Sequence, residues 1–272
     1  MSDKTLNLNF NFHWTWFKER KALGGKDLTF RLLQIFMAEM LGTMMLVFWG
    51  CNSLGHMNTG DPIVACWLFG NIVFIAIQIF GPISNCHINP AVTLSFFIYG
   101  YVSVVLMIIY IIAQCIGAII GYGLLMTFGT DNLSDLDYGY HKSDNFCVTM
   151  VGVKKAWKGM VLEACGTAVL CFMIGRICNP LNPKGLRSIM FVFSLAIMIL
   201  GYSLAPWTGA SVNPARSLGP ALMTGQFKDH WVYWIGPMSG SLIASFLYHI
   251  FFLPKVEYLD DDTVQPAAST EK

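Results

Sequence analysis

Charged residues are scarce in this sequence. Asp, Glu, Lys and Arg make up 12% of the 272 residues, about half of the share that a soluble domain carries. Hydrophobic residues make up 55%. This balance excludes an ordinary soluble globular protein and indicates a membrane protein. The formal net charge of +1 leaves no basic footprint for nucleic acid, so we expect no nucleic-acid partner.

The sequence also lacks the patterns of a catalytic or metal centre. It holds no Cys-x-x-Cys pair, and no nucleophile–base pair or metal set converges within its apolar segments. We therefore expect no enzyme activity, no cofactor and no metal ion. A buried thiol behaves as a small hydrophobe, so we expect the eight cysteines to be packing residues. Most lie in apolar segments, among them Cys66, Cys115, Cys165 and Cys171.

Long apolar runs dominate what is present. A helix of about 20 residues crosses the hydrocarbon core of a bilayer, which is about 30 Å thick. Six spans of this kind are predicted, at about residues 31–51, 62–80, 101–128, 156–178, 187–205 and 230–252. The chain is therefore predicted to be an all-α membrane protein. A membrane domain over 31–253 lies between a tail of residues 1–30 and a tail of residues 254–272.

The basic residues predict an orientation. Eleven of the 17 Lys and Arg residues lie in the first segment, in the loop after the fourth span, or in the last segment. The positive-inside rule then places both termini in the cytoplasm. The contrary evidence is a basic group near the other face, at Lys142, Lys154, Lys155 and Lys158. The loop over 129–153 would lie outside, where its sequon at Asn132 could be glycosylated.

The chain repeats itself once. Glu39 and Glu163 are 124 positions apart, and so are Asn89 and Asn213. The two halves cover about residues 31–128 and 156–253, with three predicted spans each. An odd number of spans reverses the direction of the second half, which predicts an inverted repeat. Many transporters build this architecture around a site at the membrane midplane.

Each half contains the tripeptide Asn-Pro-Ala, at Asn89-Pro90-Ala91 and at Asn213-Pro214-Ala215. Asn is a favoured helix N-cap and Pro is favoured at the first helical position. The apolar run after each tripeptide is too short to cross a bilayer. We therefore predict two half-length helices, one entering from each side, whose N-termini meet near the midplane.

These segments, "HINPAVTLS" and "SVNPARSLGPAL", resemble the aquaporin, or major intrinsic protein, family. The paired glutamates and Gln114-x-x-Gly117 strengthen the resemblance, which covers about residues 31–253. It implies six transmembrane helices and two re-entrant half-helices around a passive channel for water and small uncharged solutes. The family is usually tetrameric, with one pore in each subunit. We expect a multi-pass protein of the plasma membrane.

The resemblance assigns roles to several polar residues. Asn89 and Asn213 would donate N–H groups to a passing oxygen and so break the proton-conducting file of water. Arg216 would line the outer constriction, since an intramembrane arginine is functional by default. Glu39 and Glu163, with Gln114, would support the two loops. For His87 a hydrogen-bonded structural role is favoured over a pH sensor.

The family's constriction corresponds to Phe69, Gly201, Ala210 and Arg216. Water-selective members usually carry histidine at the second position and often cysteine at the third. Their replacement by small residues predicts a wider, more apolar opening that suits glycerol or urea. The pattern is similar to the insect glycerol-transporting aquaporins. A one-residue shift in the fifth span would instead bring Tyr202 or Leu200 to the pore.

The sequence leaves two alternatives open. One is a water-only channel on the same fold. The other is a junction or scaffold membrane protein, against which the long acidic loop over 129–153 argues mildly. An ion channel is disfavoured by the positive midplane and by Arg216. The expected partners are water, glycerol, urea, the lipid bilayer and further copies of the chain in a homotetramer.

Overall fold

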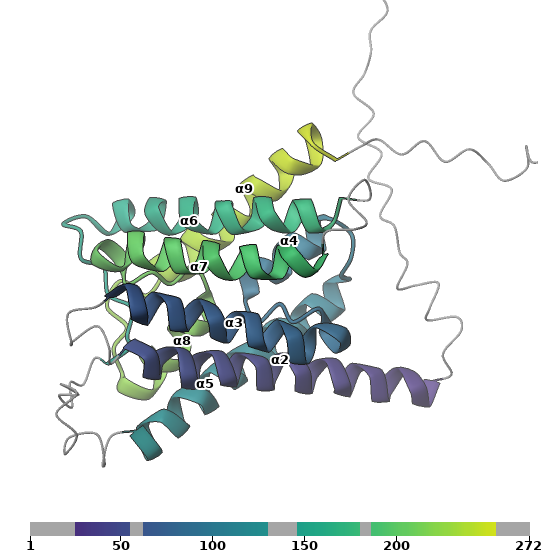
Figure 1. Cartoon of the computed structure of the whole chain (residues 1–272), viewed down its shortest axis with the longest axis horizontal. Coiled ribbons are helices and arrows are strands. Elements are labelled where there is room, and N and C mark those ends of the chain that lie inside the picture. Colours follow the sequence, from purple (N-terminus) through teal and green to yellow (C-terminus); the bar gives the residue numbers. More distant parts are fainter. Residues whose placement is uncertain (1–24, 55–61, 130–145, 180–185, 254–272) are drawn as a thin grey trace, which may run out of the picture.

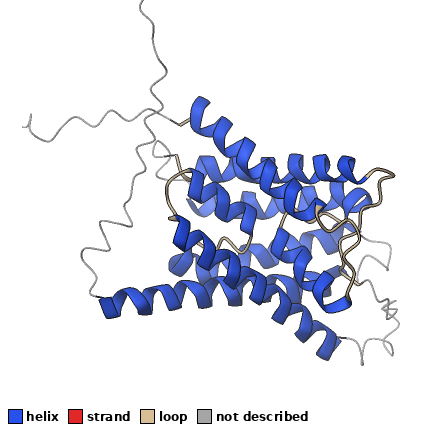
Figure 2. Cartoon of the chain, turned by 180° about the vertical axis from the view of Figure 1, so that it is seen from behind, coloured by secondary structure: helices blue, strands red, loops and turns tan. Residues whose placement is uncertain are grey.

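The computed structural model describes residues 25–54, 62–129, 146–179 and 186–253. Within these residues it contains eight helices and no strand (Figures 1 and 2). They are α2 (Gly25–Ser53), α3 (Pro62–Ser84), α4 (Pro90–Ile98), α5 (Val104–Gly129), α6 (Ala156–Ile177), α7 (Leu186–Thr208), α8 (Pro214–Thr224) and α9 (Val232–Phe251). Asn132 and most of both tails lie outside the described residues.

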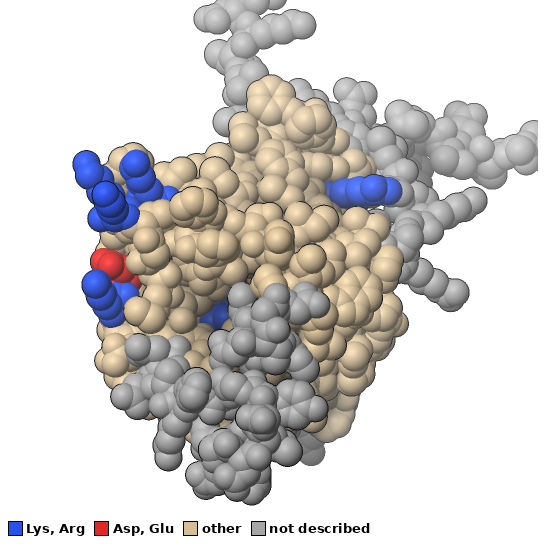
Figure 3. Space-filling view, turned by 60° about the vertical axis from the view of Figure 1, so that its left-hand side comes forward, with Lys and Arg blue, Asp and Glu red and all other residues tan. Residues whose placement is uncertain are grey.

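Six helices are long and two are short, as the sequence predicts. Five of them, α2, α3, α5, α6 and α7, are long and apolar enough to cross a membrane. The sixth, α9, has 20 residues and packs on α6 as α5 packs on α2. Large apolar side chains cover the outside of the bundle, whereas charged side chains gather near its ends (Figure 3). The protein is therefore a multi-pass membrane protein.

Two helices run past an internal proline and end later than the sequence pattern suggests. Pro82 lies inside α3 and Pro206 lies inside α7. Helical hydrogen bonding resumes after each proline, because Asn85 donates to the Gly81 carbonyl and Gly209 donates to the Ala205 carbonyl, at 2.9 and 3.0 Å. The last residues of α3 and α7 are thereby carried to the loops before the half-helices.

Small residues allow the helix pairs of the two halves to touch backbone to backbone. A Cβ atom at Gly117 of α5 would collide with the Met40 carbonyl of α2. In the other half, a Cβ atom at Gly240 of α9 would collide with the Ala164 carbonyl of α6. These close approaches are typical of helix packing in membranes. The short helices α4 and α8 lie within the same bundle (Figure 1).

The prediction that all eight cysteines are packing residues is wrong for two of them. Cys51, near the end of α2, forms a disulfide with Cys147, in the segment before α6. Their Cα atoms lie 5.5 Å apart. Proximity of this kind arises only when the chain folds, because 96 positions separate the two residues in sequence. We call this end of the bundle the disulfide end.

Candidate pore

The two half-helices begin where the Asn-Pro-Ala tripeptides predict. Asn89 caps α4, and its side-chain oxygen accepts a hydrogen bond from the Ala91 N–H at 2.9 Å. Asn213 caps α8 and accepts from the N–H groups of Ala215 and Arg216, at 3.1 and 3.2 Å. A proline follows each cap at the first helical position, where its missing N–H costs nothing.

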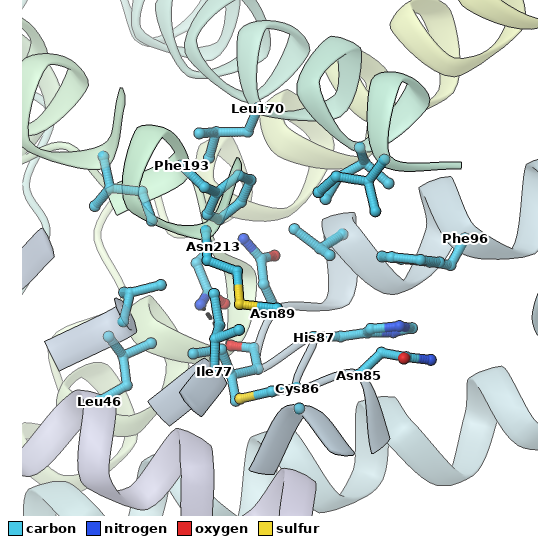
Figure 4. Close-up of a pocket in the computed structure, with 18 of the residues that line it drawn as sticks. Leu46, Ile77, Asn85, Cys86, His87, Asn89, Phe96, Leu170, Phe193 and Asn213 are labelled. Carbon is cyan, nitrogen blue, oxygen red and sulfur yellow. Dashed lines mark hydrogen bonds between the residues drawn. The ribbon is translucent and has the colours of Figure 1, made fainter. Parts of the chain in front are cut away.

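Each capping asparagine also reaches across to the other half. The Asn89 Nδ2 donates to the Val212 carbonyl and the Asn213 Nδ2 donates to the Ile88 carbonyl, both at 2.8 Å. The two helix N-termini therefore face each other inside the bundle (Figure 4). An amide NH₂ group has two N–H bonds, so this pairing leaves one on each asparagine for a ligand.

A buried carboxylate holds the loop before each half-helix. In the first half, Glu39 of α2 accepts from the N–H groups of His87 and Ile88, at 2.9 and 2.8 Å. It also accepts from the Ser84 hydroxyl at 2.6 Å. In the second half, Glu163 of α6 accepts hydrogen bonds from three groups. They are the Ser211 N–H, the Val212 N–H and the Thr208 hydroxyl.

These carboxylates restrain an unfavourable backbone. Ile88 and Val212 both have φ = +44°, a region in which β-branched residues are genuine outliers. Such strain persists only where the surroundings over-determine it. Each of these residues donates its N–H to a carboxylate, and its carbonyl accepts a hydrogen bond from the opposite asparagine. The strained turn therefore points one carbonyl and one asparagine from each half at the centre of the protein.

In the first half a further polar network surrounds the loop. Gln114 donates to Glu39 Oε2 at 2.8 Å and to the Thr93 hydroxyl at 2.9 Å. Thr93 donates in turn to the Asn89 carbonyl. The Thr93 oxygen can therefore only accept from His87 Nδ1, 3.3 Å away, so that nitrogen carries the proton. The His87 ring also stacks on Phe96, with centroids 4.1 Å apart. This supports the structural role expected for His87.

A cavity of about 510 Å³ runs past both asparagines. At the disulfide end it reaches Phe69 and Arg216, and at the other end it reaches Gln78, Asn85 and Tyr101. Between these ends the walls are mostly apolar side chains from both halves, including Leu46, Ile77, Leu170 and Phe193 (Figure 4). An elongated apolar channel with polar groups at its centre and ends suits small polar molecules moving in a file.

Arg216 is almost completely buried, with 3% of its surface exposed. Its Nη1 donates to the Cys147 carbonyl at 2.8 Å, and its guanidinium carbon lies 5.6 Å from the centre of the Phe69 ring. The structure thus brings Arg216 and Phe69 together. The Cys147 carbonyl is a partner that sequence reasoning missed.

Gly201 and Ala210 lie nearby but do not border this cavity. A Cβ atom at Gly201 would point toward Cys66 of α3, 3.5 Å from its sulfur, one helical turn before Phe69. Tyr202 is 51% exposed on the outside of the bundle. Leu200 packs toward Gly166 of α6. Ala210 donates its N–H to the Thr208 hydroxyl at 3.3 Å.

The Ser84 and Thr208 hydroxyls were also missed. They are 124 positions apart, as the glutamates to which they donate are. Extending the repeat comparison to hydroxyl residues would have found them.

A family model described as "Major intrinsic protein" matches residues 27–248 of the chain. That range covers most of the sequence and both half-helices. The chain belongs to the major intrinsic protein family. Members of this family are membrane channels that pass water and small solutes, and the family is not one of enzymes.

Curated major intrinsic proteins resemble the chain over most of its length. It is 35% identical to Aquaporin-4 of Mus musculus over 229 residues, which cover 81% of this chain and 68% of that protein. It is 33% identical to Aquaporin-2 of Bos taurus over 230 residues, 83% of this chain and 81% of the relative. The X-ray structure of the aquaglyceroporin from Plasmodium falciparum shares the fold, with a TM-score of 0.68 and 24% identity. That match covers 80% of this chain and 95% of the other.

Proposed function

We propose that this protein is a passive plasma-membrane channel for water and for small uncharged solutes such as glycerol and urea. The observation that carries the wider solute range is the register of α7. Tyr202 points outward, and Gly201 faces the turn of α3 that holds Cys66. Tyr202, the large neighbour of Gly201 on α7, therefore does not line the cavity that Arg216 borders. The channel domain would cover residues 31–253, between tails 1–30 and 254–272.

The centre of the pore supports the exclusion of protons. Each half-helix carries about half a positive charge at its N-terminus, and the two N-termini meet beside Asn89 and Asn213. The remaining N–H of each asparagine would donate to the same passing oxygen. A water molecule bound in this way cannot accept from its neighbour in the file, so the file cannot relay a proton past this point.

The disulfide end would hold the selectivity filter. Arg216 borders the cavity with a fixed charge and several N–H donors, and the Phe69 ring offers an apolar face beside it. A polyol would turn its oxygens toward Arg216 and its carbon skeleton toward Phe69. Gly201 and Ala210 would leave the space that such a solute needs. The charge of Arg216 would repel cations.

The disulfide supports the proposed orientation. Disulfides persist in oxidising compartments outside the cytosol, so the end that holds Cys51 and Cys147 would face outward. The start of α2 and the end of α9 would then lie on the cytoplasmic side.

We further propose a homotetramer, as the resemblance implies. Native mass spectrometry of the detergent-solubilised protein checks it, and a monomer would contradict it.

Stopped-flow light scattering on proteoliposomes tests the proposed function. A sucrose gradient should cause shrinkage much faster than in protein-free vesicles. A glycerol gradient should cause shrinkage followed by fast reswelling. Fast water flux without reswelling would favour the water-only channel and overturn the solute range. Absence of both fluxes at confirmed reconstitution would overturn the channel and favour a junction or scaffold role.

A further inference from the structure

A short segment at the disulfide end, residues 146–152, ties four helices together. We call it the outer strap. Cys147 is joined covalently to Cys51 near the end of α2. The Phe146 carbonyl accepts from the Tyr122 hydroxyl of α5 at 2.7 Å. The remaining ties are Thr149 to Ser217 of α8 and Gly152 to the Trp207 carbonyl of α7, both at 2.8 Å.

The strap presents one group to the pore wall, the Cys147 carbonyl that accepts from Arg216. This carbonyl owes its direction to an unusual backbone, because Cys147 has φ = +59°. The left-handed region costs a non-glycine residue about 1–2 kcal/mol, so such a residue needs restraint from its surroundings. The disulfide is a covalent restraint on this same residue. Both cysteines are buried, with Cys51 completely inaccessible.

Arg216 depends heavily on that carbonyl. Within the described residues, the guanidinium donates a hydrogen bond to the Cys147 oxygen alone, and the Arg216 Nε has no hydrogen-bond partner. The guanidinium also faces the Phe69 ring, and the Glu163 carboxylate attracts it electrostatically, but neither interaction fixes its direction as a hydrogen bond does. If the Cys147 carbonyl turned away, the guanidinium would lose its anchor on the wall and could enter the cavity that it borders.

We propose that the Cys51–Cys147 disulfide positions the filter arginine and thereby sets solute selectivity. The disulfide fixes Cys147, whose carbonyl holds Arg216 against the wall and keeps the opening wide. Opening the disulfide releases Arg216 into the pore, which obstructs a larger solute more than it obstructs water. In the reduction, the S–S bond breaks and each sulfur gains a hydrogen, while a dithiol reductant becomes a disulfide. This inference rests on the proposed function.

The variant Cys51→Ala tests the inference, because it opens the disulfide and leaves the Cys147 backbone in place. We expect the ratio of glycerol to water permeability to fall at least about threefold in proteoliposomes, equivalent to about 0.7 kcal/mol. The matched control is Cys171→Ala, which removes a buried free thiol on α6 and should leave the ratio unchanged. Mass spectrometry of unreduced peptides checks that the wild-type disulfide is present.

A second background separates positioning from general stability. In Arg216→Val, the further change Cys51→Ala should leave the permeability ratio where Arg216→Val alone puts it. An equal fall in both backgrounds, or an unchanged ratio in Cys51→Ala at wild-type abundance, overturns the inference. If Cys51→Ala does not reach the membrane, reduction of the reconstituted wild type should lower the ratio and reoxidation should restore it. A wild type without glycerol flux refutes the proposed function instead, and the inference is then judged from water flux alone.

Discussion

The two halves of the chain hold their half-helices in the same way. Glu39 receives the N–H groups of two successive loop residues, and Glu163 receives those of the residues 124 positions later. Tyr110 donates to the Ser84 carbonyl, and Tyr233 donates to the Thr208 carbonyl. Each half has a strained β-branched residue at φ = +44° before its asparagine. These glutamates, tyrosines and strained loop residues support the half-helices equivalently in both halves, and we call them the frame.

The lining of the pore differs between the halves. The four predicted filter positions have counterparts 124 positions away, at the other end of the cavity. The filter set is Phe69, Gly201, Ala210 and Arg216, and the counterpart set is Phe193, Ile77, Cys86 and Val92. All four counterparts border the cavity and none is charged. The repeated frame therefore determines where the half-helices lie, whereas residues outside the frame determine what the two ends of the pore select.

Breaking the frame should have the largest effect. In Glu163→Gln the new NH₂ group faces the Val212 N–H, so two donors meet without an acceptor. We expect a loss on the order of 3 kcal/mol of stability. It would be measured as a fall in thermal melting temperature and in the yield of folded protein.

Glu39→Gln should be less damaging, although the carboxylates are equivalent. Gln114 donates to Glu39 Oε2, and its own Oε1 has no partner among the described residues. A turn of the Gln114 amide would supply an acceptor for the new NH₂ group, although its clash with the Ile88 N–H would remain. In this helix the two halves are offset by 123 positions, as Gly117 and Gly240 are, so the counterpart of Gln114 is Pro237, which offers no such group. Equal melting temperatures for the two variants would contradict this asymmetry.

Arg216→Val makes the outer lining resemble the inner one, because Val92 is its counterpart. A unit charge contributes about 4 kcal/mol at 4 Å in partly buried surroundings, so removing it should raise proton and cation leak at least about tenfold. The leak is measured with a pH-sensitive dye in proteoliposomes. The matched control Val92→Ala should not raise it. An unchanged leak in Arg216→Val would remove the role in charge exclusion assigned to Arg216.

Gly201→His tests the small residue on α7. Extra bulk in a site is worth about 1–3 kcal/mol of discrimination, so glycerol permeability should fall about tenfold or more while water permeability is largely kept. Stopped-flow reswelling in glycerol measures the change. Tyr202→Ala is the control, because this side chain points out of the bundle and should leave both fluxes as they are. Undiminished glycerol flux in Gly201→His would show that Gly201 does not face the pore.

The smallest expected effect tests whether the frame is equivalent at a single hydrogen bond. Tyr110→Phe and Tyr233→Phe each remove one donor to a loop carbonyl. Each should cost about 1 kcal/mol of stability. The melting temperature should fall to a similar extent in the two variants. Selectivity should not change in either variant. A much larger loss for one of them would mean that the two halves bear unequal shares of the stability.

The repeated parts of the molecule were the predictable ones. The paired glutamates and asparagines indicate an inverted repeat from the sequence alone, and the N-caps of α4 and α8 lie at the asparagines that predicted them. Such features depend on local sequence preferences, such as helix capping by Asn-Pro, that occur in both halves of the chain. Helix ends were less predictable. Pro82 and Pro206 suggest stops, yet the helices continue because hydrogen bonding resumes beyond each proline.

The contacts outside the repeat could not be predicted. The bond between Cys51 and Cys147, and the carbonyl that holds Arg216, depend on where the outer strap crosses the bundle. No period or motif encodes that crossing. The mutual bonds of the asparagines were also missed. The sequence suggested that Asn89 and Asn213 donate to a ligand, whereas in the structure each first satisfies a carbonyl of the opposite half.

The bonds between Asn89 and Val212 and between Asn213 and Ile88 have a consequence for biosynthesis. The first re-entrant loop leaves the ribosome 123 residues before its partner. At about 5–20 residues per second, that is a wait of about 6–25 s. During this time the Asn89 amide and the Ile88 carbonyl have no partner from the second half, inside a membrane that tolerates unpaired polar groups poorly. The nascent first half must therefore be sheltered by water, by the insertion machinery or by a neighbouring chain until the second half arrives.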